Sequence, residues 1–179
     1  MKGTQDLELI LGGKISNTNN GFTLSAYCDA DWAGDQDERK SRSGHLVLLN
    51  DSVVCWSSKL QTSTALSSTE AEYICTSNSA TMILWMRTLL AEIGFLQDTP
   101  TIIFQDNKST MAIAMSRKQQ PGVKHIDIRY HFLRDRIASG ELKLIQLSTT
   151  EMIADLFTKQ LSFPTFNKHR TSMRIQVLS

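Results

Sequence analysis

Phe22–Asp35 has the sequence FTLSAYCDADWAGD, and this stretch decides the fold that we expect. Its first residues alternate between two sides, with Phe22, Leu24, Ala26 and Cys28 on one and Thr23, Ser25, Tyr27 and Asp29 on the other. A period of two residues is typical of a β-strand with one face in a core. The Trp-Ala-Gly segment at 32–34 then indicates a bend. We therefore predict a strand that ends at Asp29.

Two further β-rich runs follow this strand. Gly44–Leu49 and Val53–Trp56 are separated by the turn formers at 50–52. Three successive strands joined in this way indicate an antiparallel meander.

The hydrophobic period then changes to that of a helix. Between Ser67 and Ile93, apolar residues recur at helical spacing. Ser67 and Glu70 have the S-x-x-E form of a capping box, and Gly94 follows the last turn. We predict one long amphipathic helix here.

The remainder of the chain alternates strands and helices. We predict, in order, a strand at 101–106, helices at 107–116 and 126–140, a strand at 142–147 and a helix at 148–159 that begins with a second S-x-x-E pair, Ser148 and Glu151. Leu7–Leu11 is a weaker candidate for an additional strand. The order predicts an α/β fold with a five-stranded mixed sheet, three antiparallel strands followed by parallel ones, flanked by helices.

The composition is that of one globular domain. The chain has 179 residues, of which 41% are hydrophobic and 21% charged. Its 19 Lys and Arg against 18 Asp and Glu give a net charge of +1, so this is not a strongly basic nucleic-acid-binding domain. No apolar run approaches the roughly 20 residues of a membrane span, and we expect no membrane partner.

The cysteines and tryptophans are expected inside. Cys28, Cys55 and Cys75 are unclustered and lack the spacing of zinc ligands, which favours reduced core cysteines. The three tryptophans are expected in the core or at its edge: Trp32, Trp56 and Trp85.

Four acidic residues stand at positions where sites form. Asp29 and Asp106 end predicted strands, Glu72 lies in the first turns of the long helix, and Asp155 lies in the first half of the last helix. Carboxylates gathered at the carboxyl ends of neighbouring parallel strands repel one another, and a divalent cation relieves that repulsion. Magnesium prefers such oxygen ligands, and two ions are suited to phosphodiester hydrolysis. Acids at these places are also common without a site, because they solvate loops and favour helix dipoles.

Two neighbouring acids need a separate argument. Glu70 and Glu72 lie about 200° apart around a helix, so both cannot face one site, and the capping box occupies Glu70. Asp31 follows Asp29 by two residues and is a candidate for a supporting position.

Six stretches, in order along the chain, resemble the ribonuclease H domain of copia-type retrotransposon Pol polyproteins. They are YCDADWAGD at 27–35, WSSKLQ at 56–61, ALSSTEAEY at 65–73, QDNKS at 105–109, KHIDIRYHF at 124–132 and IADLFTKQL at 153–161. The resemblance extends from about Leu7 to Phe166, and it implies a ribonuclease H-like fold.

The resemblance also implies an active site and an activity. Its Asp-Glu-Asp-Asp set falls on Asp29, Glu72, Asp106 and Asp155, with two Mg²⁺ ions that Mn²⁺ can replace. Asp29 and Asp106 would bind metal most directly, Glu72 would hold the ion on the leaving-group side, and Asp155 the ion that activates water. The implied activity is hydrolysis of the RNA strand of RNA–DNA hybrids during reverse transcription. Many cellular relatives carry a histidine before the last Asp, whereas 148–151 here is STTE.

Candidate substrate contacts come from hydroxyl, amide and basic residues near these motifs. Hydroxyls and amides suit an RNA strand, and cations suit a phosphate backbone. The candidates are Ser67, Ser68, Asn107, Arg42, Lys59, Lys124 and His125. Arg129 belongs to a further basic patch, although basic loops are often merely solvated.

The resemblance further suggests a setting. We expect 1–20 to be a remnant of the polymerase–nuclease connection, 21–162 the ribonuclease H domain, and 163–179 a C-terminal tail. The polymerase and connection of the same polyprotein are the expected partner, in cytoplasmic virus-like particles, with the nucleus as the alternative location. A domesticated, non-catalytic module that binds nucleic acid or protein is the alternative function. A transposase or integrase is disfavoured, because those use three acids in another order.

Overall fold

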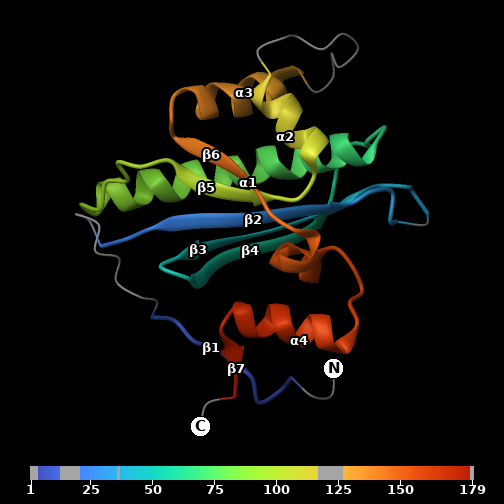
Figure 1. Cartoon of the computed structure of the whole chain (residues 1–179), viewed down its shortest axis with the longest axis vertical. Helices are drawn as coiled ribbons and strands as arrows, with labels where there is room; N and C mark the ends of the chain where they lie inside the picture. The colour runs from blue at the N-terminus through green and yellow to red at the C-terminus, as the bar shows by residue number, and fades with distance from the viewer. Residues whose placement is uncertain (1–3, 13–20, 36, 117–126, 178–179) are drawn as a thin grey trace.

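A five-stranded mixed sheet forms the centre of the computed structural model, which describes residues 4–12, 21–35, 37–116 and 127–177 (Figure 1). The strand order is β4-β3-β2-β5-β6. Within this sheet, β2 with β3 and β3 with β4 pair antiparallel, whereas β2 with β5 and β5 with β6 pair parallel. This confirms the predicted architecture. The strands are β2 (Leu24–Asp31), β3 (Arg42–Leu49), β4 (Ser52–Leu60), β5 (Thr101–Gln105) and β6 (Leu142–Gln146).

The central strand β2 separates two cores, as its alternation predicts. Leu24, Ala26, Cys28 and Ala30 belong to the larger core, which lies under the helices on one face. Tyr27, from the intervening positions, packs against a smaller core on the other face. Asp29 shares the side of Tyr27 and is almost fully buried. The strand continues to Asp31, two residues beyond the predicted end.

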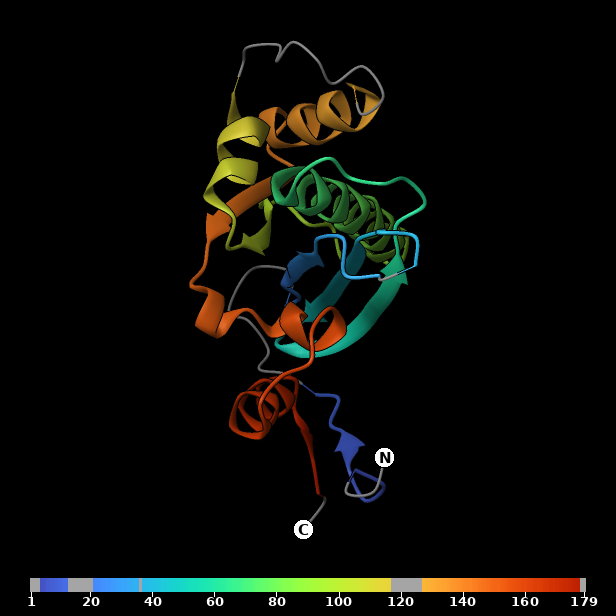
Figure 2. The same cartoon turned by 90° about the vertical axis from the view of Figure 1, so that its right-hand side faces the viewer.

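Three helices cover the larger core. They are α1 (Ser68–Glu92), α2 (Lys108–Met115) and α3 (Asp127–Ala138), and they lie on one side of the sheet in both views (Figures 1 and 2). Their buried residues join those of β2, β5 and β6 in one cluster. The start of α1 is the predicted cap, since the Ser67 hydroxyl accepts from the Glu70 amide at 3.1 Å and the Glu70 carboxylate accepts from the Leu66 amide at 3.0 Å.

The opposite face is covered differently from our prediction. Instead of one helix over 148–159, two short 3₁₀ helices form, η1 (Thr149–Glu151) and η2 (Ile153–Phe157), and the Ser148 side chain makes no capping hydrogen bond. Met152, Ile153 and Ala154 are all buried in the smaller core. The backbone amides of Met152, Asp155 and Thr158 donate to carbonyls three residues earlier, which is the pattern of a 3₁₀ helix and not of an α-helix.

The two ends of the described chain meet below this face. The helix α4 (Phe163–Ser172) packs on η2, and the short strand β7 (Ile175–Gln176) pairs antiparallel with β1 (Glu8–Leu9) (Figure 1). The strand candidate at Leu7–Leu11 therefore forms, but outside the main sheet. The predicted division at residues 20 and 162 stays a prediction.

The aromatic prediction is wrong, whereas the prediction of core cysteines is confirmed for Cys28 and Cys75 and only in part for Cys55, which is half-buried. Trp32, Trp56 and Trp85 are 48%, 57% and 58% exposed. Trp32 donates through Nε1 to the Ala65 carbonyl at 3.1 Å, which explains how it keeps a fixed place at the surface. All three cysteines are free, and two of them are buried.

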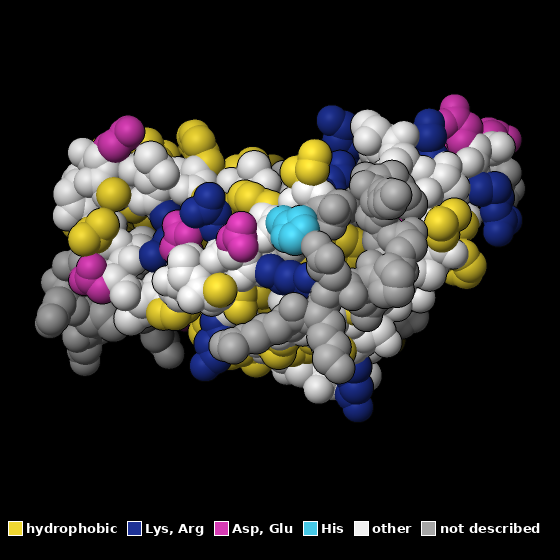
Figure 3. All heavy atoms as spheres, turned by 90° about the horizontal axis from the view of Figure 1, so that it is seen from above, with side chains coloured by type: hydrophobic (Ala, Val, Ile, Leu, Met, Phe, Trp, Pro, Cys, Tyr) yellow, Lys and Arg dark blue, Asp and Glu magenta, His cyan; other side chains and the backbone are white. Residues whose placement is uncertain are grey.

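The surface shows no concentration of one charge on the side seen in Figure 3. Described Lys and Arg side chains lie there among acidic and apolar ones, in agreement with the net charge of +1. Of the residues described, none forms a helix long and apolar enough to cross a membrane.

Candidate metal centre

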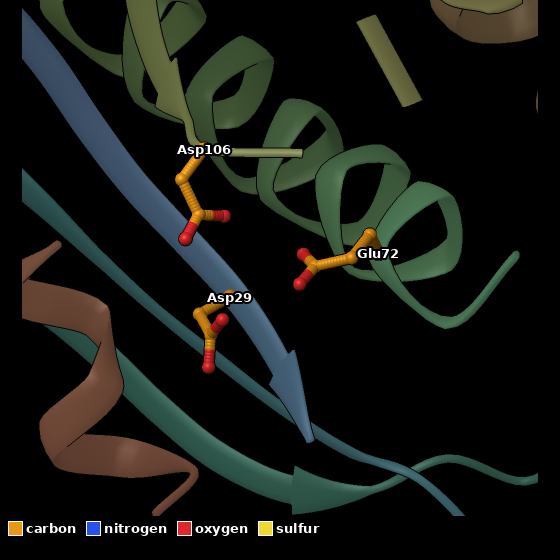
Figure 4. Close-up of side chains that lie close together, drawn as sticks. All are labelled: Asp29, Glu72 and Asp106. Atoms are coloured by element: carbon orange, nitrogen blue, oxygen red, sulfur yellow. The ribbon is translucent and has the colours of Figure 1, made fainter. Parts of the chain in front are cut away.

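Three carboxylates from separate stretches of the chain meet at one edge of the sheet. Asp29 lies near the end of β2, Asp106 follows β5 directly, and Glu72 lies in the first turns of α1. One oxygen of each lies within 4.8 Å of the others, and the three side chains lie close together (Figure 4). Tyr27 is the register partner of Phe104 in the parallel β2–β5 pair, so the aspartates two residues further on lie opposite each other.

Asp155 reaches the same region from η2, through a lysine. The ammonium of Lys159 lies 3.1 Å from Oδ1 of Asp29 and 3.0 Å from Oδ1 of Asp155. The second oxygen of Asp29 accepts a hydrogen bond from the Thr158 hydroxyl. The structure therefore brings all four predicted acids to one place, but Asp155 lies outside the tight three-carboxylate cluster.

Gln105, the last residue of β5, connects two of these acids. It is fully buried, and its Nε2 donates to Oε2 of Glu72 at 3.3 Å and to the Thr76 hydroxyl at 3.0 Å. Its Oε1 accepts from the backbone amides of Asp106 and Asn107 at 2.8 and 2.9 Å. This residue was missed in the sequence, where only its place beside Asp106 signalled it.

Asp106 is fixed from the side of η1. The Thr149 hydroxyl donates to Oδ2 of Asp106 at 2.8 Å. Thr149 lies in the STTE segment at 148–151, which lacks the histidine that many cellular relatives carry before the last Asp. In this chain the Thr149 hydroxyl contacts Asp106 instead.

Burial and mutual repulsion shift the protonation of the acids. Burial, followed by the charges of Asp29, Cys75 and Asp106, raises the pKa of Glu72 to about 10. Burial and then Asp29 raise the pKa of Asp155 to about 6, against the opposing effect of Lys159. Burial alone lowers the pKa of Lys159, but the two aspartates outweigh it and the net pKa is raised.

The hydroxyl and amide candidates for substrate contact lie at helix starts. Ser67 caps α1 and Ser68 next to it is exposed. The Asn107 side chain caps α2 by accepting from the Thr110 amide at 3.0 Å. Capping therefore already engages the single side-chain oxygen of Ser67 and of Asn107.

The basic candidates line two hollows. Arg42, at the start of β3, and Lys159 line an open groove of about 720 Å³. Lys59 and Arg129 line a second cavity of about 310 Å³, with the buried His45 and Gln61 among its walls. Lys124 and His125 lie outside the described residues.

The fold and the site together define the class, a domain with the ribonuclease H-like fold. A ribonuclease H1 isolated from compost superposes with a TM-score of 0.56 at 12% identity, over 76% of this chain and 92% of that one. The same enzyme in complex with an RNA/DNA hybrid gives a TM-score of 0.55 at 10% identity, over 76% of this chain and 94% of that one. At such low identity the likeness concerns the fold.

Sequence relatives identify the particular family. The chain is 37% identical over 163 residues to the retrovirus-related Pol polyprotein from transposon RE1 of Arabidopsis thaliana, which covers 91% of this chain and 11% of the polyprotein. It is 38% identical over 136 residues to that from transposon TNT 1-94 of Nicotiana tabacum, over 76% of this chain and 10% of the polyprotein. No protein-family model matches the sequence. The chain belongs to the retrovirus-related Pol polyproteins of copia-type transposons, and the part of them that it covers has the ribonuclease H-like fold.

The chain spans only about a tenth of the length of these relatives. The activities and partners of a whole polyprotein are therefore matters for proposal.

Proposed function

We propose that this domain is a metal-dependent endonuclease that hydrolyses the RNA strand of RNA–DNA hybrids during retrotransposon reverse transcription. One observation carries the proposal: Asp29, Glu72 and Asp106 bring their oxygens within 4.8 Å of one another at the carboxyl edge of the parallel strands. Ligands bind at this edge in open α/β sheets.

The donor set fits a hard divalent cation. It consists of carboxylate oxygens, which are the ligands that such a cation prefers. We propose Mg²⁺, with Mn²⁺ as a substitute, held by Asp29, Glu72, Asp106 and Asp155. Two such ions, when bound, would activate the attacking water and stabilise the leaving oxygen.

The chain's own residues keep the ligands in place. Thr158 holds Asp29, Gln105 holds Glu72, and Thr149 holds Asp106. Fixed donors of this kind preserve the arrangement of the carboxylates that the reaction requires.

The proposed substrate is the RNA–DNA hybrid, since a structural neighbour is described in complex with one. The open groove beside Asp31, with Arg42 and Lys159 in its walls, adjoins the acids and offers cations to a phosphate backbone. Ser67, Ser68 and Asn107 are proposed contacts to the RNA strand. Lys59, Lys124 and His125 are proposed contacts to phosphates.

The proposed partner and location follow from the relatives. They are Pol polyproteins, which supports association with the reverse transcriptase polymerase and connection of the same chain. We propose action in cytoplasmic virus-like particles, with the nucleus as the alternative.

Cleavage of a labelled hybrid tests the proposal. The wild-type protein, Asp106→Asn and the control Glu92→Gln are incubated with an RNA-labelled hybrid and Mg²⁺. Glu92 is exposed at the far end of α1, roughly 30 Å along the helix from Glu72. We expect cleavage by the wild type and by Glu92→Gln, and a loss of at least about 100-fold in Asp106→Asn.

The same assay separates the alternative function. Binding of the hybrid without cleavage at any Mg²⁺ or Mn²⁺ concentration would favour a non-catalytic module. Equal cleavage by the wild type and Asp106→Asn would show that the three-carboxylate cluster is not the active site.

A further inference from the structure

Lys159 occupies the position between two of the four acids. Its ammonium lies 3.1 Å from Oδ1 of Asp29 and 3.0 Å from Oδ1 of Asp155, and its side chain is 34% exposed. With Thr158 on Oδ2, both oxygens of Asp29 already have a donor. The Lys159 ammonium therefore neutralises two adjacent carboxylates, as a metal ion at this place would.

The four acids are consequently not equivalent. Asp29, Glu72 and Asp106 form the three-carboxylate cluster, whereas Asp155 is not part of it and meets Asp29 across the ammonium of Lys159. A divalent ion held by Asp29 and Asp155 would draw on the same two carboxylates that Lys159 already engages. It would lie next to a like charge, and two cations a few ångström apart in a half-buried site repel each other strongly.

Lys159 also has an alternative place to go. It lines the open groove of about 720 Å³ together with Arg42 and Ser58, and with the acidic Asp31 and Asp35. A phosphate group in that groove would offer the ammonium another anion within reach of a flexible four-carbon side chain.

We propose that Lys159 is a built-in competitor of the second metal ion. The free domain binds one divalent ion, at Asp29, Glu72 and Asp106. The position between Asp29 and Asp155 accepts a second ion only when a substrate phosphate draws the lysine away. This inference rests on the proposed function for its choice of ligands, a divalent metal ion and an RNA–DNA hybrid, but it does not require that the hybrid be cleaved.

Metal titration of the full chain tests the competition. Binding of Mn²⁺ is followed by calorimetry and by electron paramagnetic resonance in the wild type, Lys159→Met, Lys159→Arg and Lys143→Met. Methionine keeps most of the length without the charge, and arginine keeps the charge. Lys143 is an exposed lysine on β6, and its variant controls for the loss of one positive charge.

We expect one ion per chain in the wild type, in Lys159→Arg and in Lys143→Met. In Lys159→Met we expect a second ion, bound at least tenfold more tightly than any second ion is bound by the wild type. Thermal unfolding with and without Mn²⁺ establishes that Lys159→Met is folded, and we expect the metal to raise its melting temperature more than that of the wild type. One ion in Lys159→Met, or two in the wild type, would overturn the competition.

A hybrid that cannot be cleaved tests the displacement. Addition of a 2′-O-methyl RNA–DNA hybrid, corrected for Mn²⁺ bound by the hybrid alone, should raise the wild-type stoichiometry from one to two. An unchanged stoichiometry with bound hybrid would overturn this part. If the protein does not cleave an ordinary RNA–DNA hybrid, the proposed function is contradicted. The number of bound Mn²⁺ ions still decides the role of Lys159 independently.

Discussion

Gln105 and Glu72 share a buried hydrogen bond, with Nε2 of Gln105 donating to Oε2 of Glu72 at 3.3 Å. The same amide accepts from the backbone of Asp106. One uncharged residue thus joins the end of β5 to the start of α1 and fixes the distance between two carboxylates. We expect it to determine both stability and metal affinity.

Replacement of Gln105 by methionine tests that role. Methionine has a similar length but leaves the amides of Asp106 and Asn107 without their acceptor, so we expect a loss of about 1–3 kcal/mol in the free energy of unfolding. Metal binding should weaken as well. Urea denaturation and Mn²⁺ titration provide the two measurements.

The matched control is Gln146→Met. Gln146 is the exposed register partner of Gln105 on β6 and should change stability by less than about 0.5 kcal/mol. Equal effects of the two substitutions would contradict a specific role for Gln105.

The metal-free domain should lose stability as the pH rises. Burial and the neighbouring acids raise the pKa of Glu72 from its ordinary value of 4.5 to about 10. The folded state therefore retains a proton that the unfolded chain releases. This contribution to stability is complete below the unfolded pKa and is lost as the pH approaches the folded one.

Thermal unfolding in a chelator between about pH 5 and pH 9 measures this effect. We expect a falling melting temperature in the wild type, and a smaller decrease in Glu72→Gln or after addition of Mg²⁺. A decrease of the same slope in Glu72→Gln would show that another group is responsible.

Gly44 permits the close approach of the segment that carries Asp155. A Cβ at this position of β3 would lie 2.7 Å from Cγ2 of Thr158, 2.8 Å from Cβ of Phe157 and 3.1 Å from the Ala154 carbonyl. Gly44→Ala should therefore push η2 away from the sheet, at a cost of about 1–3 kcal/mol. Because Asp155 and Lys159 move with it, we also expect altered metal binding. Unchanged unfolding and unchanged metal titration together would refute this packing.

Ser67 has a structural role as the N-cap of α1, which can be tested separately from its proposed contact with substrate. Its hydroxyl accepts from the Glu70 amide, so Ser67→Ala should cost about 1 kcal/mol in stability. Ser68→Ala removes an exposed hydroxyl without a capping bond and should cost less than about 0.5 kcal/mol. Denaturation measures the difference, and identical values for the two variants would contradict the cap.

The candidate acids could be predicted because local patterns encode where each one stands. Alternation in β2 places Asp29 on one face near a strand end, and helix geometry with the Ser67 cap separates Glu70 from Glu72. These are short-range properties of the chain, fixed by backbone period and hydrogen bonding within a few residues. The strand order and the mixed sheet follow from the same periods together with the rules of chain connection.

Only the tertiary structure decided how the acids are held and divided. Lys159 reaches Asp29 across 130 residues, and Thr149 reaches Asp106 across 43. No local period records such contacts, because they depend on where separate elements pack. The break of the expected last helix likewise accompanies a tertiary contact, the packing of residues 152–154 into the smaller core. The sequence determined which acidic residues are candidates for the chemistry. Packing determined that Asp29, Glu72 and Asp106 form one cluster and that Lys159 lies between Asp29 and Asp155.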